Sequence, residues 1–256
     1  MEMRLFVFAD YESGYEILKF LSKTDDIVGL ATVRPEYEMH LNKGYPDKIR
    51  KLVDINNNYI FYSDEVHNNI DIVKSLEPDY ILCLNGAILL KPELISVPKY
   101  GCINLHLAYL PYNRGPNPNV WSIVEETPIG VTIHYINDKI DNGPIIAQRL
   151  VNKESIDTGK TLWYKLSNVA IELYKETWPK IKNNSINPTK QEHNNATMHY
   201  RNDLSKLDEI KLDDMYKAKY LINLIRARTF RPFPSAYFID SEGKKVYVRI
   251  DLEYEK

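Results

Sequence analysis

The chain has 256 residues, of which 44% are hydrophobic and 27% charged, and its formal net charge at pH 7 is -2. This composition is typical of a globular protein with one large domain and at most a small appendage, and it excludes non-specific DNA or RNA binding through bulk positive charge. The apolar runs are too short for a signal peptide or a membrane span. We therefore expect a cytoplasmic protein that binds neither membrane nor nucleic acid, and whose two cysteines are buried free thiols.

Strand-like and helix-like segments alternate through the first half of the chain. Strands are predicted at residues 4–9, 27–33, 59–63, 79–85, 102–107, 130–136 and 144–151, and helices at residues 15–21 and 64–76, the second capped by Asp64. Apolar strands that alternate with helices favour an α/β fold with a mostly parallel, Rossmann-like sheet and helices on both faces. In such sheets ligands bind beyond the carboxyl ends of the strands.

The second half begins with a long helical pattern from Asp157 to Lys180, which we expect Pro179 and the Asn-rich stretch after it to end. The Asn-rich segment that continues to Asn195 is a predicted linker, because it has few apolar residues to bury. The chain is accordingly expected to divide into a main domain at 1–190 and a tail at 191–256. Within the tail, the pattern predicts an amphipathic helix over 212–228 and a β-hairpin joined by a Ser-Glu-Gly turn.

Asn104 and His106 are the strongest candidates for chemistry. They lie two residues apart on a short apolar strand, so their side chains share a face. An amide beside an imidazole can donate hydrogen bonds to a developing oxyanion, and Asp141 in a later turn could orient the imidazole or accept a proton. The strand alone is also compatible with a buried polar pair satisfied by the backbone. Three prolines between residues 111 and 118 stiffen the next loop, which favours a binding site.

Other motifs are weaker. Gly159-Lys160-Thr161 resembles the end of a phosphate-binding loop but lacks the first glycine, so a helix N-terminus capped by Asp157 or Thr158 is the better interpretation. The turn after the first strand has one glycine, Gly14, where a phosphate cradle usually has several. The histidines lack metal-ligand spacing, and His134 is interpreted as a packed residue on a strand, so we expect no metal.

Two neighbouring segments, GCINLHLAYLPYNRG and GVTIHYINDKIDNGPII, resemble the catalytic core of the 10-formyltetrahydrofolate-dependent formyltransferases. That family carries Asn-x-His, a Leu-Pro-x-x-Arg-Gly loop and an Asp-x-Gly turn in this order. Here the motifs are found at Asn104, His106, Leu110-Pro111, Arg114-Gly115 and Asp141-Gly143. LIRARTFRPFPSAYF also resembles the segment that follows the catalytic domain in methionyl-tRNA and sugar formyltransferases. The resemblance identifies residues 1–190 as a formyltransferase catalytic domain.

Within this family the chain is most similar to the sugar N-formyltransferases. Its tail is shorter than the tRNA-binding barrel of the methionyl-tRNA enzyme, and it lacks the glycine-serine loop of the glycinamide ribonucleotide enzyme. The resemblance implies formyl transfer from N10-formyltetrahydrofolate to a nucleotide-linked amino-dideoxy sugar, such as a dTDP-3-amino or dTDP-4-amino sugar for O-antigen or another surface glycan. It also implies a homodimer formed through the tail. A formyltransferase for another amine, or a non-catalytic folate or nucleotide-sugar binding protein, stays open.

The resemblance also implies roles for individual residues. Catalysis is assigned to Asn104, His106 and Asp141. The expected folate-binding residues are Asn85, Gly86, Ala87, Ile88, Leu89, Leu90, Leu107, Leu110, Pro111, Asn137, Asp138, Lys139 and Ile140. The expected contacts with the sugar nucleotide are Tyr11, Tyr109, Asn113 and Arg114. An arginine fork suits a diphosphate, but Arg114 could equally brace its own loop.

Overall fold

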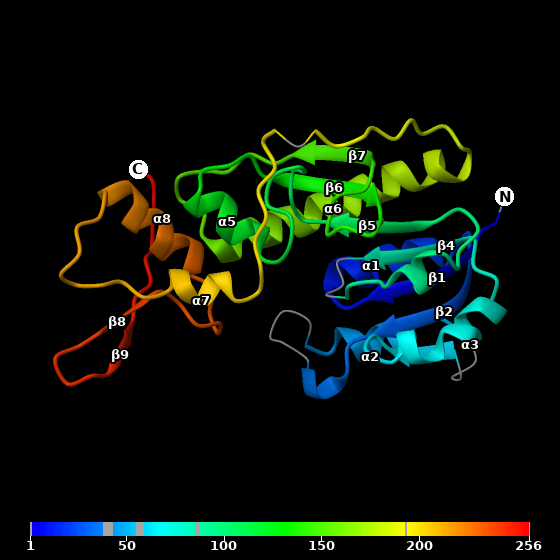
Figure 1. Ribbon diagram of the computed structural model, residues 1–256, viewed down its shortest axis with the longest axis horizontal. Helices are drawn as coiled ribbons and strands as arrows, with labels where there is room; N and C mark the ends of the chain where they lie inside the picture. Colours follow the sequence, from blue (N-terminus) through cyan, green and yellow to red (C-terminus); the bar gives the residue numbers. More distant parts are fainter. Residues whose placement is uncertain (1, 38–42, 55–58, 85–87, 193, 256) are drawn as a thin grey trace. The chain divides into compact units, whose positions relative to one another are not determined.

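The structure is a computed structural model that describes residues 2–37, 43–54, 59–84, 88–192 and 194–255. The chain divides into two compact units (Figure 1). The first unit consists of Met1–His106, Val131–Arg149 and Ser167–Gln191, and the second of Leu107–Gly130, Leu150–Leu166 and Glu192–Lys256. Each unit is therefore built from segments that are separated in the sequence. The expected domain boundary between residues 190 and 191 stays a prediction.

A seven-stranded sheet in the order β3-β2-β1-β4-β5-β6-β7 forms the centre of the first unit. The strands are β1 (Arg4–Ala9), β2 (Asp26–Thr32), β3 (Ile60–Tyr62), β4 (Tyr80–Leu84), β5 (Cys102–His106), β6 (Gly130–Tyr135) and β7 (Ile145–Leu150). The pairings among β1 to β5 are all parallel, whereas β6 runs antiparallel to β5. The predicted mostly parallel sheet is confirmed, with a reversal at β6 that the sequence pattern did not indicate.

The helices vary widely in length, and α6 is the longest of those described. They are α1 (Glu12–Leu21), η1 (Pro35–Tyr37), α2 (Tyr45–Arg50), η3 (Val66–Asn69), α3 (Ile70–Ser75), α4 (Pro92–Ile95), α5 (Pro118–Val124), α6 (Gly159–Lys182), α7 (Asp203–Leu207) and α8 (Ala218–Arg228). A two-stranded antiparallel hairpin, β8 (Tyr237–Ile239) with β9 (Lys245–Tyr247), lies near the end of the chain. Among the described residues, no helix combines the length and apolar character needed to cross a membrane.

Helices cover both faces of the sheet, as expected from strands that are apolar throughout. On one face lie α1 and the later part of α6, whose Trp178 ring centroid is 5.8 Å from that of Tyr80 on β4. On the other face, α3 and α4 close a core that includes Phe6 and Phe8 of β1. Cys83 and Cys102 are buried as free thiols, which confirms the sequence expectation.

Two predicted helix boundaries are wrong. Pro179 does not end α6, which continues to Lys182, because the apolar side of the helix remains buried at Trp178 and Ile181. The helix predicted over 212–228 begins only at Ala218. Of the apolar residues before it, Tyr216 packs against a small apolar cluster, but Leu212 and Met215 are exposed. Helical periodicity without tertiary packing does not sustain a helix in water.

Two local interpretations also need correction. Asp64 does not cap a helix, because its carboxylate pairs with Arg34 and the 3-10 turn η3 precedes α3. The predicted linker is partly structured, since Thr189 exchanges two backbone hydrogen bonds of 2.8 Å with Ile145 of β7. β7 is an edge strand of the sheet, so its free backbone groups can fix a polar segment that buries few apolar side chains.

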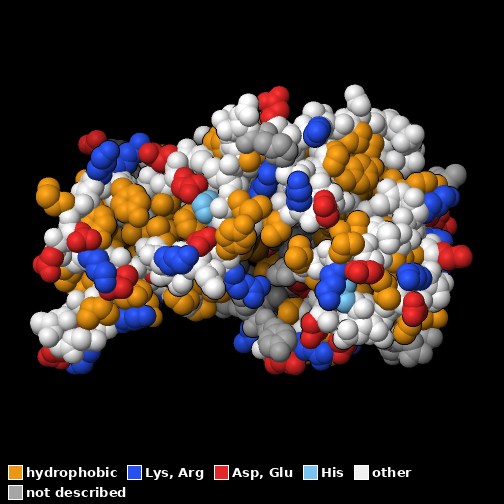
Figure 2. All heavy atoms as spheres, viewed as in Figure 1, with side chains coloured by type: hydrophobic (Ala, Val, Ile, Leu, Met, Phe, Trp, Pro, Cys, Tyr) orange, Lys and Arg blue, Asp and Glu red, His pale blue; other side chains and the backbone are white. Residues whose placement is uncertain are grey.

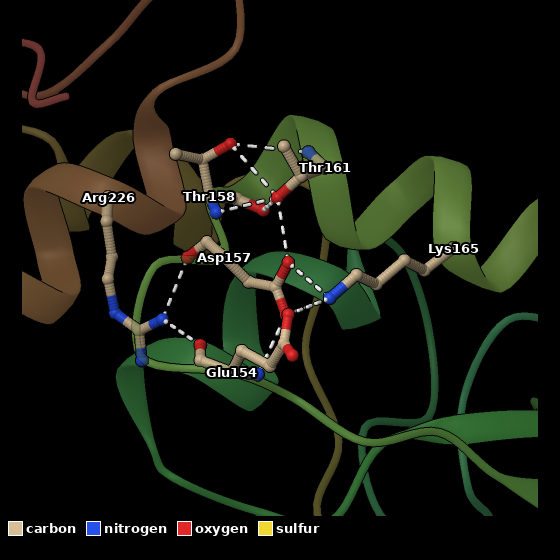
Figure 3. A network of polar contacts seen from close by, with 6 residues as sticks. All are labelled: Glu154, Asp157, Thr158, Thr161, Lys165 and Arg226. Carbon is tan, nitrogen blue, oxygen red and sulfur yellow. Dashed lines mark hydrogen bonds and ion pairs between the residues drawn. The ribbon is translucent and has the colours of Figure 1, made fainter. Parts of the chain in front are cut away.

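The second unit contains a helix N-terminus where the sequence offered a weak phosphate-binding motif (Figure 3). Thr158 caps α6, because its Oγ1 accepts a hydrogen bond of 3.2 Å from Thr161 N. From α8, Arg226 Nη1 donates to the carbonyls of Glu154 at 3.1 Å and Asp157 at 2.8 Å. The helix-cap interpretation is confirmed, and α8 is tied to the start of α6.

Candidate functional site

The polar strand pair lies in the first unit, at the carboxyl end of β5. The antiparallel register places His134 of β6 opposite Asn104, and Thr132 opposite His106. Residues opposite one another in adjacent strands point to the same side. Four polar side chains of β5 and β6 therefore share one face of the sheet.

Asp141 joins this group from the loop after β6. Its Oδ2 lies 3.6 Å from His106 Nε2, and its Oδ1 lies 3.5 Å from His134 Nε2 and 3.2 Å from Asn104 Nδ2. Tyr135 at the end of β6 pairs with Ile103, so the loop must return across the face of β5 to reach His106. The structure thus brings together the three residues that the sequence grouped as catalytic, and their role in catalysis stays a prediction.

The orientation of Asn104 follows from its neighbours. His134 Nδ1 lies 2.8 Å from the carbonyl oxygen of Tyr135, which can only accept, so Nδ1 carries the proton. In the neutral ring Nε2 is then an acceptor, and it lies 3.1 Å from Asn104 Nδ2. The amide nitrogen therefore donates to both His134 and Asp141. A flipped amide would place its oxygen against two acceptors, so the observed orientation is favoured.

His134 is a site residue that the sequence interpretation missed. It is buried on its strand, as a packed residue would be, but its ring also contacts Asn104 and Asp141. The alternation of Thr132 and His134 was visible in the sequence. The alternation places His134 beside Asn104 only if β6 pairs with β5 in the antiparallel register, and a parallel-sheet prediction does not provide that register.

The loop that carries Asp141 is closely constrained. Asp141 has a positive φ of 47°, a region that Asp adopts more readily than most residues. A Cβ atom at Gly143 would lie 1.8 Å from the carbonyl oxygen of Tyr135, so a side chain at this position would collide with backbone. Asn137 Oδ1 accepts a hydrogen bond of 3.0 Å from Lys139 N, which forms a local turn. The sequence therefore specifies the path of this loop.

The expected folate-binding residues of the first unit occupy two loops. Asn85, Gly86 and Ala87 lie outside the described residues. Of the residues that follow, 88–90, Leu90 is buried and Leu89 is 67% exposed. Residues 137–140 lead directly into Asp141 and are half-buried or exposed. Binding of a folate to these loops stays a prediction.

Tyr11 also belongs to the first unit, where it precedes α1 and is half-buried. Burial, and then the neighbouring charge of Asp10, raises the pKa of the Tyr11 phenol to about 12, so the hydroxyl keeps its proton at neutral pH. A neutral phenol can both donate and accept hydrogen bonds. Its expected contact with the sugar nucleotide stays a prediction.

The other residues that are expected to contact the folate or the sugar nucleotide lie in the second unit. Leu107 and Leu110 are buried, whereas Tyr109 and Pro111 are half-buried.

Asn113 and Arg114 are held by the segment that follows residue 192. Asn113 N donates to Thr197 Oγ1 at 2.8 Å, and Arg114 N donates to the Thr197 carbonyl at 3.0 Å. The Asn113 amide also donates to Thr127 Oγ1 at 2.9 Å, and the Arg114 side chain is buried. These hydrogen bonds hold the loop of Asn113 and Arg114 in place. Contact of these two residues with a sugar nucleotide stays a prediction.

Comparison with known proteins identifies relatives along the whole chain. The family model described as "Formyl transferase" matches residues 31–177, and the model described as "N-formyltransferase dimerization C-terminal domain" matches residues 203–254. The dTDP-4-amino-4,6-dideoxyglucose formyltransferase of Mycobacterium tuberculosis is 37% identical over 155 residues, which cover 60% of this chain. The match spans 66% of the length of that mycobacterial protein, just under two thirds.

Two further relatives match more of the chain. Methionyl-tRNA formyltransferase of Bacillus subtilis is 33% identical over 234 residues, which cover 88% of this chain and 68% of that protein. A solved structure of a 4-N formyltransferase from Francisella tularensis shares the fold with a TM-score of 0.83 at 27% identity, over 99% of each chain. Residues 31–177 contain Asn104, His106 and Asp141 and make up more than half of the 256 residues. The chain belongs to the formyltransferase family.

Proposed function

We propose that the protein transfers a formyl group from N10-formyltetrahydrofolate to the amino group of a nucleotide-linked amino-dideoxy sugar. The observation that carries this proposal is the convergence of Asn104 and His106 on Asp141, each within hydrogen-bonding or ion-pair distance of its carboxylate. The relatives support the choice of acceptor. The mycobacterial relative is named for a dTDP-4-amino sugar, and the Francisella structure is that of a 4-N formyltransferase.

In the proposed reaction the sugar amine attacks the formyl carbon, and the former carbonyl oxygen becomes an oxyanion. Asn104 and His106 supply hydrogen bonds to that oxyanion. Asn104 keeps one amide hydrogen on His134, and the other, which Asp141 accepts in the structure, passes to the oxyanion when the substrates are bound. Removing one such donor typically lowers turnover by ~10²–10³-fold.

In this proposal Asp141 assists the removal of a proton from the attacking amine. Its carboxylate lies close to both imidazoles, so it orients His106 and stabilises the ring when that ring is protonated. The attacking amine loses a proton to this Asp141–His106 pair, directly or through water. As the tetrahedral intermediate collapses, the bond between the formyl carbon and N10 breaks and the proton passes to N10. Atoms and charge balance without a metal ion or a redox step.

Each substrate has an expected place. The folate is proposed to bind the residues that the family resemblance implies, 85–90, 107–111 and 137–140, largely through backbone groups. The nucleotide sugar is proposed to contact Tyr11, Tyr109, Asn113 and Arg114. A cytoplasmic location is part of the proposal, because the free thiols Cys83 and Cys102 suit a reducing compartment.

A homodimer is also part of the proposal. The dimerization model matches residues 203–254. In this range large hydrophobic side chains are exposed on α8 and on the β8–β9 hairpin: Tyr220, Ile222, Ile239, Val246 and Tyr247. Figure 2 shows hydrophobic side chains at the surface around these elements. Clustered exposed apolar side chains favour an interface.

A transfer assay tests the function. The protein is incubated with N10-formyltetrahydrofolate and a panel of dTDP- and UDP-linked 3-amino and 4-amino sugars, with aminoacyl-tRNA as a further acceptor, and products are detected by mass. We expect one nucleotide sugar to gain one formyl group, and the Asn104→Ala and Asp141→Asn proteins to bind folate with almost no turnover. Asp71→Asn, a change of the same type at an exposed position of α3, serves as the control.

The outcomes separate the alternatives that the sequence left open. Formylation of aminoacyl-tRNA instead of any sugar would move the protein to another branch of the family. Folate binding without transfer to any acceptor would favour a binding protein. Wild-type rates in both Asn104→Ala and Asp141→Asn would overturn the mechanism.

A further inference from the structure

We infer that Gln191 is a positioning residue that holds the Asp141 turn in its active conformation. Gln191 Nε2 donates two hydrogen bonds, to the Asp141 carbonyl at 2.9 Å and to the Gly143 carbonyl at 2.8 Å. The side chain is only 4% exposed. A primary amide has two hydrogens on its nitrogen, so one buried nitrogen fixes two carbonyls that are two residues apart. This inference rests on the proposed function, because it concerns the same Asp141.

The turn needs support from outside itself. Asp141 has a positive φ, which Asp tolerates better than most residues but less well than glycine, so contacts with its surroundings help to hold this conformation. On one side the turn is limited by Tyr135, whose carbonyl leaves no space for a Cβ at Gly143. On the other side Gln191 binds both carbonyls. Tyr135 and Gln191 therefore both restrict the turn.

Gln191 is itself held in place by backbone pairing. Two residues before it, Thr189 exchanges two hydrogen bonds of 2.8 Å with Ile145, which lies two residues after Gly143. The short segment Thr189–Gln191 therefore runs beside the end of the turn, with backbone contacts at its start and the Gln191 amide at its end. The segment predicted as a linker supplies this support.

The chemistry of the site depends on this geometry. Asp141 lies 3.6 Å from His106 and 3.5 Å from His134, at the outer limit of direct contact. A displacement of about 1 Å at a reacting group can lower the rate by ~10²-fold. Gln191 donates to the backbone of the turn and acts through Asp141. Its loss should therefore lower kcat and leave the binding of either substrate nearly unchanged.

The first test is kinetic. Gln191→Met keeps the length of the side chain and removes both donors, and Gln191→Glu places acceptor oxygens against the two carbonyls. Thr189→Ala is the matched control, because Thr189 is exposed and its hydrogen bonds to other described residues come from its backbone. We expect kcat to fall by about 10- to 100-fold in both Gln191 variants, with both KM values within about threefold of wild type. Thr189→Ala should behave as wild type.

A double-mutant cycle separates positioning from a general structural role. If Gln191 acts through Asp141, Gln191→Met should cause almost no further loss of kcat in an Asp141→Asn background. If Gln191→Met acted only by a general loss of stability, it would lower kcat by the same factor in the wild-type and Asp141→Asn backgrounds. Full additivity, or wild-type kcat in both Gln191 variants, would overturn the inference.

The second test does not depend on formyl transfer. The ring ¹⁵N chemical shifts of His106 and His134 are compared at fixed pH in wild type and in the Gln191→Met and Gln191→Glu proteins. Movement of the Asp141 carboxylate should shift both resonances, whereas those of His67 and His199 should stay unchanged. Unchanged His106 and His134 resonances would overturn the inference. Shifted resonances in a protein that transfers no formyl group would contradict the proposed function and leave the inference standing.

Discussion

Gly143→Ala adds one methyl group beside the Asp141 turn. The new Cβ would lie 1.8 Å from the Tyr135 carbonyl oxygen and 2.7 Å from its carbon. A carbon and a carbonyl oxygen need about 3.3 Å, so the turn must move by about 1.5 Å relative to β6. The atoms in the way belong to backbone that is paired in the sheet, and a rotamer change cannot relieve the collision.

This displacement sets the expected magnitude. Asp141 lies two residues before Gly143 and is within 3.6 Å of His106 and 3.5 Å of His134. A movement of more than 1 Å would break both contacts. Loss of alignment on this scale lowers catalysis by ~10²-fold. Overpacking of this kind also costs about 1–3 kcal/mol of stability.

The assay is steady-state formyl transfer below the melting temperature of each variant. Gly159→Ala is the matched control, because its Cβ would lie 2.1 Å from the Ala227 carbonyl oxygen in the second unit, an equally severe collision. We expect kcat/KM to fall by ~10²-fold in Gly143→Ala and to stay near wild type in Gly159→Ala, with both proteins less stable. Wild-type kcat/KM in Gly143→Ala, or an equal loss in both variants, would refute this reasoning.

Three further predictions concern the second unit. Burial lowers the pKa of Lys153 to about 8, so between pH 8 and 10.5 the unfolded chain keeps a proton that the folded protein has released. The stability of wild type relative to Lys153→Met, measured by urea unfolding, should therefore rise with pH across this window, and a constant difference would contradict it. Arg226→Met removes the hydrogen bonds that Arg226 donates to the carbonyls of Glu154 and Asp157, although the Glu154 carbonyl keeps a bond from Asp157 N. The free energy of unfolding should therefore fall by about 1–3 kcal/mol, and a loss under ~0.5 kcal/mol would exclude this role. Val246→Glu should convert a dimer to a monomer in size-exclusion chromatography with light scattering, and a monomeric wild type at micromolar concentration would refute the dimer.

Much of the sheet could be predicted from the sequence because both of its faces are buried. Strands such as β1 and β4 are apolar at nearly every position, which distinguishes them from the amphipathic helices between them. The grouping of Asn104 with His106 followed from the two-residue period of a strand. Asp141 could be placed in a turn, but its return across β5 depends on tertiary structure.

Other parts of the site could not be predicted because they depend on pairing between distant segments. His134 enters the site through the antiparallel register of β6, which the pattern of apolar residues leaves open. Gln191 is uncharged and lies 50 residues from Asp141 in a segment of low hydrophobicity. Its position is fixed by hydrogen bonds to the backbone, and these have no periodic signature in a sequence.

The two cysteines provide internal reporters of how the sheet opens. Cys83 and Cys102 lie on adjacent strands at the centre of the sheet, and both are buried. Burial raises the pKa of the Cys102 thiol to about 12 and that of Cys83 well above its usual value, so neither forms a thiolate near neutral pH in the folded protein. A thiol reagent can modify them only in molecules in which β4 and β5 are exposed. Because the chain has no other cysteine, the labelling rate of unmodified protein would measure opening next to Asn104 without an introduced probe.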